Sequence, residues 1–102
     1  MGMSRSTAVV DVTAAATDEV VAAVAGKAIT VHGFITSGSA SATVATFKSA
    51  TRDISGSIFH AANATVVAPI SHDGWFKTSG GEALNLTATT GNVTGCVVYS
   101  VG

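Results

Sequence analysis

The chain has 102 residues and a formal net charge of −1 at pH 7, and charged side chains occupy only 11% of its positions. A chain of this length forms one domain of ordinary size and leaves no room for a second. Its five Lys and Arg residues are scattered between Arg5 and Lys77, which excludes a basic patch for nucleic acid or an anionic membrane surface.

The composition favours strands over helices. Ala, Gly, Ser and Thr make 54 of the 102 residues, Val and Thr occur 14 times each, and Leu occurs twice. β-Branched side chains suit the pleated backbone, whereas the long unbranched residues that helices prefer are scarce here. We therefore predict an all-β fold. A surface with so few charges resists association poorly, so we expect a partner to cover much of it.

At the N-terminus, residues 1–7 read as a flexible arm and residues 8–102 as the folded domain, with a first strand over residues 8–13. Residues 17–26 are ambiguous. Thr17 followed by two acids and a later Gly26 is compatible with a capped helix. A strand over residues 20–23 with a turn at 25–27 is the alternative that we favour, because Lys27 leads directly into the next strand.

Residues 28–36 alternate with a period of two, which predicts a half-buried strand. One face would carry Ile29, Val31, Gly33 and Ile35. The other face would carry Thr30, His32 and Phe34. This alternation places His32 and Phe34 on the outward face, where they are candidates for contact with another subunit.

Short apolar runs separated by turn residues fill the rest of the chain. The runs cover residues 42–48, 54–59, 64–69, 74–78 and 95–101, and Pro69 ends one of them. Gly80 and Gly81 predict a hairpin from residues 74–78 to a returning strand in which Leu84, Leu86 and Ala88 alternate with polar residues. About eight or nine short strands at this spacing predict a single antiparallel β-sandwich or barrel.

No pattern of catalytic or metal-binding residues is present in the sequence. The three histidines, His32, His60 and His72, are far apart and match no metal-ligand spacing. The six acidic residues form no recognisable pair, and no nucleophile motif or phosphate-binding glycine loop occurs. We predict a protein that is not an enzyme, with no catalytic residue, no metal and no cofactor.

Three further residues stand out. Cys96 is the single cysteine, so no intrachain disulfide forms, and its apolar neighbours predict a buried small side chain. Trp75 and Phe76 are adjacent aromatics, of which alternation sends one into the core and the other outward. We take both as candidate interface residues, with packing of both inside the subunit as the alternative.

The sequence carries no secretory signal and no apolar run long enough to cross a membrane, so synthesis in a cytoplasm and no membrane partner are expected.

One order of residues is more specific than the composition: Gly74-Trp-Phe76 followed by Gly80-Gly-Glu-Ala-Leu-Asn-Leu86. It is accompanied by Val20-Val-Ala-Ala-Val-Ala-Gly-Lys27, by Thr46-Phe-Lys-Ser49 and by Ala61-Ala-Asn63 before an apolar run to Pro69. With these features, residues 20–86 resemble a group of small virion structural proteins of tailed phages and prophages.

The resemblance implies a compact jelly-roll of the kind found as a trimeric decoration (cement) protein on the outer surface of a phage capsid. The partners it implies are sister copies and the major capsid protein, and it implies no catalytic residues and no nucleic acid. The alternative is a receptor- or glycan-binding module of a phage fibre or tail, in which Trp75, His72 and Asp73 would stack against and bind a sugar.

Overall fold

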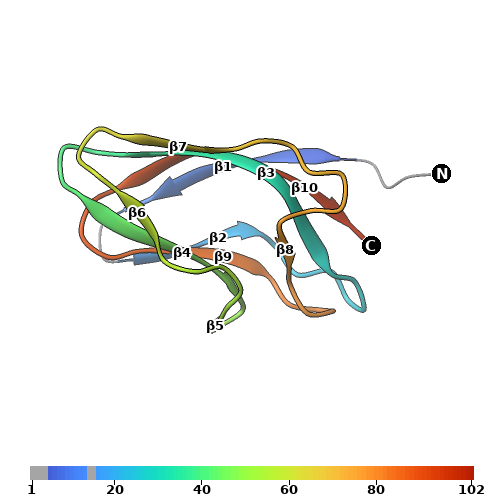
Figure 1. Cartoon of the computed structure of the whole chain (residues 1–102). Coiled ribbons are helices and arrows are strands. Elements are labelled where there is room, and N and C mark those ends of the chain that lie inside the picture. Colours follow the sequence, from blue (N-terminus) through green and yellow to red (C-terminus); the bar gives the residue numbers. More distant parts are fainter. Residues whose placement is uncertain (1–4, 14–15) are drawn as a thin grey trace.

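The structure is a computed structural model that describes residues 5–13 and 16–102. Within these ranges the fold is all-β, with no helix and with ten strands in two antiparallel sheets, which confirms the fold class (Figure 1). The strands are β1 (Ser6–Val12), β2 (Ala16–Val21), β3 (Ile29–Gly38), β4 (Thr43–Ser49), β5 (Arg52–Asp53), β6 (Ile58–His60), β7 (Thr65–Ala68), β8 (Phe76–Lys77), β9 (Leu84–Ala88) and β10 (Val93–Val101).

The strand pairing is nested along the chain. Sheet A has the order β1-β10-β3-β7, with β8 also on β3, and sheet B has the order β2-β9-β4-β5, with β6 also on β4. The first strand therefore pairs with the last, β2 with β9, β3 with β7 and β8, and β4 with β5 and β6. A chain folded back on itself in this way and wrapped into two facing sheets has the jelly-roll topology.

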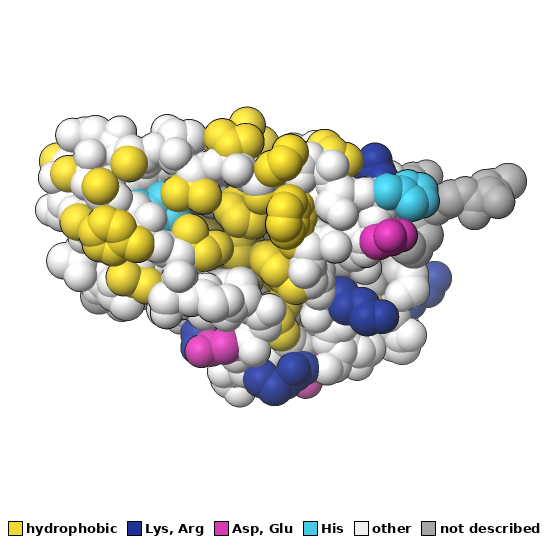
Figure 2. Space-filling model, viewed as in Figure 1, with side chains coloured by type: hydrophobic (Ala, Val, Ile, Leu, Met, Phe, Trp, Pro, Cys, Tyr) yellow, Lys and Arg dark blue, Asp and Glu magenta, His cyan; other side chains and the backbone are white. Residues whose placement is uncertain are grey.

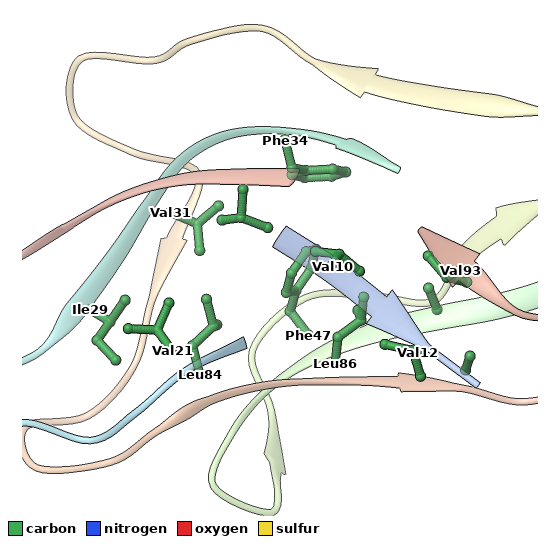
Figure 3. Packing of buried hydrophobic residues seen from close by; sticks show 13 residues of the cluster. Val10, Val12, Val21, Ile29, Val31, Phe34, Phe47, Leu84, Leu86 and Val93 are labelled. Carbon is green, nitrogen blue, oxygen red and sulfur yellow. The ribbon is translucent and has the colours of Figure 1, made fainter. Parts of the chain in front are cut away.

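The core lies between the two sheets, which form the upper and lower layers of Figure 1. In sheet B, Leu84, Leu86 and Ala88 are buried, as the alternation of this segment predicts. The ring of Phe47 on β4 reaches sheet A, with centroids 5.2 Å from Phe34 and 5.1 Å from Phe76. Figure 3 shows side chains of both layers pointing toward one another. Each such apolar side chain contributes about 1.5–3 kcal/mol by its removal from water.

A β-bulge in β3 changes the predicted orientation of its second half. Gly33 pairs with Val98 and Val31 pairs with Tyr99, so His32 is an extra residue with no partner of its own on β10. An extra residue reverses the alternation that follows it. Phe34 therefore packs in the core and Ile35 is exposed, so the orientation predicted for these two residues is wrong.

The first half of the ambiguous segment 17–26 belongs to a strand, β2, which begins at Ala16 and ends at Val21. A tight turn follows, in which Gly26 has φ of 70° and the Lys27 N–H donates to the Val24 carbonyl at 3.0 Å. A strand followed by a turn at 25–27 is therefore confirmed and the helix is excluded, but the strand covers residues 16–21 and not the expected 20–23.

The hairpin predicted at Gly80 and Gly81 is wrong, although a turn is present there. Gly81 has φ of 80° and its N–H donates to the Lys27 carbonyl at 2.9 Å. The strands on either side belong to different sheets, because β8 pairs with β3 and β9 pairs with β2 and β4. Two glycines signal a change of direction, but the hydrophobic faces of the flanking strands decide which strands pair.

Two boundaries also differ from the sequence prediction. β1 begins at Ser6, inside the expected arm, while residues 1–4 lie outside the described residues. Of the expected strand over 54–59, only the end is a strand, as part of β6. Residues 54–57 are a loop in which the N–H groups of Ile54 and Ser55 both donate to the Phe47 carbonyl, at 3.0 and 3.3 Å.

Candidate interaction surface

The face of sheet A that points away from the core carries an apolar row from one edge to the other. The pairing places Val9 of β1 beside Cys96 of β10, Cys96 beside Ile35 of β3, and Ile35 beside Val67 of β7. Three of these side chains are far more exposed than core residues, at 76% for Val9, 46% for Ile35 and 59% for Val67. We call these four residues the apolar row.

The residues around the apolar row are also almost uncharged. A parallel row of polar residues consists of Asp11, Thr94, Ser37 and Thr65, in which the hydroxyls of Ser37 and Thr65 are 2.8 Å apart. Asp11 is the one Asp, Glu, Lys or Arg residue in β1, β10, β3 and β7. Water therefore meets hydroxyls and apolar groups over most of this face.

A hollow of about 200 Å³ deepens the apolar row beside β7. The residues that line it are Gly33, Phe34, Ile35, Val67, Ala68, Pro69, Ile70, Cys96 and Val98. Gly33 leaves room for Ile70 here, because a methyl group on Gly33 would lie 2.9 Å from the end of the Ile70 side chain. The loop after β7 thus forms one wall, and apolar side chains form the rest.

Over β2, β9, β4 and β5, the outward face of sheet B is of the ordinary solvated kind, and the exposed Phe59 of β6, beside Val44, is an apolar exception. Its pairing aligns Glu19, Asn85, Lys48 and Asp53 in one row, with an ion pair of 2.7 Å between Lys48 and Asp53. The next row consists of Thr17, Thr87 and Thr46. Charged and hydroxyl side chains at these positions are typical of a sheet face that is exposed to solvent. The contrast with sheet A identifies sheet A as the candidate interaction surface.

A second apolar hollow, of about 410 Å³, lies on the side of the sandwich where β8 and residues 54–58 meet. Its lining consists of Phe34, Ile54, Ser55, Gly56, Ile58, Ala68, Trp75 and Phe76. Figure 2 shows hydrophobic side chains gathered in the middle of this side, with charged side chains confined to the lower and right-hand parts of the view.

His32, predicted as an interface residue, is buried within the subunit. It lies on the side of sheet A away from the core, but it is only 4% exposed. Its Nδ1 donates to the Ser71 carbonyl at 2.9 Å, since a carbonyl oxygen can only accept, and in the neutral ring Nε2 accepts from the Ser100 hydroxyl at 2.7 Å. The loop before β8 therefore covers the ring, and its expected exposure is wrong.

The three predicted aromatic residues occupy different environments. Phe34 is buried, and Phe76 is half-buried with its ring centroid 6.4 Å from that of Phe34. Trp75 is 52% exposed, and its indole Nε1 donates to the Pro69 carbonyl at 2.9 Å. The alternation expected for Trp75 and Phe76 is therefore present, and Trp75 is the member of the pair that a partner can reach.

His60 is fully buried and has a structural environment. Its Nδ1 donates to the Ile58 carbonyl at 3.1 Å, and its Nε2 accepts from the Thr36 hydroxyl at 2.8 Å, which ties sheet B to sheet A. His72 and Asp73 are exposed in a turn. Over residues 5–13 and 16–102, no three His, Cys, Asp or Glu side chains come together in a way that could hold a metal ion.

A polar cluster around Ser49 could be mistaken for a nucleophile with its base. The Ser49 hydroxyl donates to the Glu82 carboxylate and accepts from the Ser79 N–H at 3.0 Å, and Arg52 lies 3.6 Å from Glu82. Ser49 is buried beneath these groups, so no substrate atom can approach its oxygen. The cluster holds the turn between β4 and β5 against the crossover that follows β8.

Cys96 is half-buried and faces outward in the apolar row, so its predicted place in the core is wrong. Sequence reasoning also did not single out Val9, Ile35 and Val67. The signal for them was present in the Val- and Ile-rich segments, but which face of each strand lies outward depends on pairing and on the bulge at His32.

No protein-family model matches the chain, and no curated protein matches its sequence. A solved structure that resembles it is a virus-like particle of the extra small virus of the giant freshwater prawn Macrobrachium rosenbergii. The two are 13% identical at a TM-score of 0.38, and the alignment covers 97% of this chain and 79% of that chain. A likeness of this degree carries no inference about function.

Within the part of the chain that the structure describes, no helix has the length and apolar character needed to span a bilayer.

Proposed function

We propose that the chain is a non-enzymatic structural subunit of a virion, which works by binding other protein subunits through the outward face of sheet A. The observation that carries this proposal is the apolar row, which runs uninterrupted across β1, β10, β3 and β7. When a partner covers exposed apolar side chains, the free energy falls by about 25 cal/mol for each Å² removed from water.

The finer proposal is a decoration (cement) protein, a trimer on the outer surface of a capsid that bridges neighbouring units of the major capsid protein. The sequence resemblance of residues 20–86 supports this role, and the nested strand order agrees with the jelly-roll that the resemblance implies. The resemblance implies no cofactor, and among the described residues no cluster of His, Cys, Asp or Glu side chains could hold a metal ion.

The proposed mechanism is mechanical. A subunit present in many copies on a shell needs only a modest contact at each site, because several contacts made at once hold the coat firmly. A nearly uncharged face with many small side chains lets another subunit approach closely, because few charged groups lose their water when the contact forms. Such contacts would resist the outward pressure of the packaged genome.

The test uses heads of the phage or prophage whose genome encodes the chain, purified without the decoration layer. The wild-type protein should bind these heads and raise the temperature at which they release DNA. Ile35→Lys should abolish both effects, because it places a charge in the middle of the apolar row. Thr46→Lys, on the outward face of sheet B, should leave both unchanged.

Two results would contradict this proposal: wild-type protein that does not bind the heads, and an Ile35→Lys variant that remains folded and binds as well as wild type.

A second candidate function is recognition of a host glycan by a fibre or tail module. The half-exposed ring of Trp75 is held in place through the Pro69 carbonyl and lies two and three residues from the exposed Asp73 and His72. An immobilised aromatic face beside polar side chains suits stacking against a sugar. Binding to host polysaccharide that is lost in Trp75→Ala, with no binding to heads, would favour this candidate over the first.

A further inference from the structure

The edges of the two sheets differ in how well they are protected against pairing with another strand. An edge strand presents unpaired N–H and C=O groups, and proteins block such edges with charges, prolines, bulges or short strands. β2 has two of these devices. Asp18 stands opposite Leu86, on the core side of the sheet, and the pairing shifts between Glu19 and Val21.

The two edges on the opposite side of the sandwich are interrupted. Sheet A ends there in β7 and β8, which have four and two residues and are separated by a loop that begins with Pro69. Sheet B ends in β5 and β6, which have two and three residues with residues 54–57 between them. Neither edge offers a continuous template for a strand.

β1 has one charged residue, Asp11, and none of the other devices. It is a strand of seven residues without Pro or Lys, and it keeps one register with β10 over all seven pairs. Among the described residues, its backbone hydrogen bonds go to β10 alone, so the other side of the strand is open. An edge of this length with a single charge, in a sandwich whose other edges are short or interrupted, indicates that a strand pairs there.

We propose that β1 pairs antiparallel with β1 of a second copy of this chain, about a two-fold axis that passes by Ala8 and joins the two A sheets into one. An axis perpendicular to the sheet keeps both outward faces on the same side. Each residue of one copy therefore stands opposite a residue of the other copy such that the sum of their two numbers is even. With the axis at Ala8, this sum is 16.

Charge complementarity selects this register. With the axis at Ala8, Arg5 stands opposite Asp11 of the partner subunit, and the two-fold axis produces this pair twice. Both residues are exposed, and neither has an ion-pair partner within the described part of its own chain. Opposite charges placed directly across two strands stabilise their pairing. The small side chain of Ala8 lies at the centre, where the two copies approach each other.

This contact goes beyond the proposed function, because it joins copies in pairs whether or not a three-fold contact also forms. On a shell it would link one oligomer to its neighbour. In solution it predicts particles with an even number of chains, two or, where a trimer also forms, six. Its test therefore differs from the test of the apolar row.

The first experiment exchanges the two charges, with the molar mass measured by sedimentation equilibrium at low salt. Arg5→Glu and Asp11→Lys should each halve the mass and raise the dissociation constant of the contact by roughly tenfold, because each creates two like-charge pairs. The double variant Arg5→Glu/Asp11→Lys should restore the wild-type mass. Glu19→Lys, a charge reversal on the β2 edge, should change nothing.

The second experiment tests the register with disulfides in a Cys96→Ser background. Thr7 stands opposite Val9 of the partner subunit when the axis lies at Ala8, at a Cβ separation of about 4.5–5.5 Å that a small shift brings within reach of a disulfide. The double variant Thr7→Cys/Val9→Cys should form covalent dimers on oxidation, and neither single variant should do so.

Three results would overturn the proposal. The first is a wild-type mass that corresponds to one or three chains, and the second is a charge-exchanged double variant as weak as the single variants. The third is cross-linking of Val9→Cys alone, which would place the axis at Val9. Binding of heads by a protein that fails these tests would leave the proposed function intact.

Discussion

Gly95 of β10 lies so close to Ile35 of β3 that a methyl group on Gly95 would sit 1.9 Å from the Ile35 carbonyl oxygen. Its φ of 148° is also one that residues with a side chain rarely adopt. Both facts follow from the tight pairing of β10 with β3 at the apolar row, where Cys96 pairs with Ile35. The proposed interaction surface therefore depends on a glycine that lacks any exposed feature of its own.

Gly95→Ala should lower the free energy of unfolding by about 3 kcal/mol or more, since the strand must move away from β3 and the backbone is strained as well. Chemical denaturation followed by circular dichroism measures this change. Gly56→Ala is the matched control, because its added methyl group meets no atom within 4 Å. It should change stability by no more than about 0.5 kcal/mol. Equal effects of the two substitutions would show that the close approach does not exist.

Phe47→Ala should destabilise the fold by about 3–5 kcal/mol, because it removes the ring that packs between Phe34 and Phe76 and leaves a cavity between the sheets. Phe59→Ala removes the same ring from a position that is 65% exposed, and it should cost less than about 1 kcal/mol. Urea denaturation of both variants measures the difference. A cost for Phe59 equal to that for Phe47 would be incompatible with the placement of these rings.

Thr36→Val should cost about 1–3 kcal/mol of stability, because it keeps the shape of the side chain but leaves the buried Nε2 of His60 without its hydrogen bond. Thr17→Val makes the same change in an exposed hydroxyl pair with Thr87, where water replaces the lost bond. Its effect should be within about 0.5 kcal/mol. Thermal or urea unfolding of both variants provides the test, and a neutral Thr36→Val would refute the link between the sheets.

Cys96 should react with a small thiol reagent in the folded protein, because it faces outward and lines an apolar hollow. Binding of a partner over sheet A should slow this reaction by roughly tenfold or more, since the reagent can then reach the thiol only after the partner dissociates. Mass spectrometry of the free and the head-bound protein measures the two rates. Labelling that occurs only in denaturant would place Cys96 in the core instead.

Several elements could be predicted because their signals are local. The alternation of Leu84, Leu86 and Ala88 with polar residues correctly predicts a strand with one buried face. The turn at Gly26 and the end of a strand before Pro69 are also local, since each depends on the backbone preferences of one residue. Composition was sufficient for the all-β class.

The candidate surface could not be predicted in the same way, because it depends on contacts between distant segments. Alternation alone places Ile35 in the core and His32 and Phe34 outside. The bulge at His32 reverses the orientations of Ile35 and Phe34, and the loop that carries Ser71 covers His32 itself. No local sequence pattern predicts either the bulge or the position of the loop.

By itself, the sequence determined that this protein is built of strands, where most of them lie, and that its surface has few charges, because each of these properties belongs to single residues or to close neighbours. Only the tertiary structure decided that Val9, Cys96, Ile35 and Val67 form one row and that β1 has an open edge. Both are properties of strand order. That order is set by which apolar faces can be buried together across the whole chain.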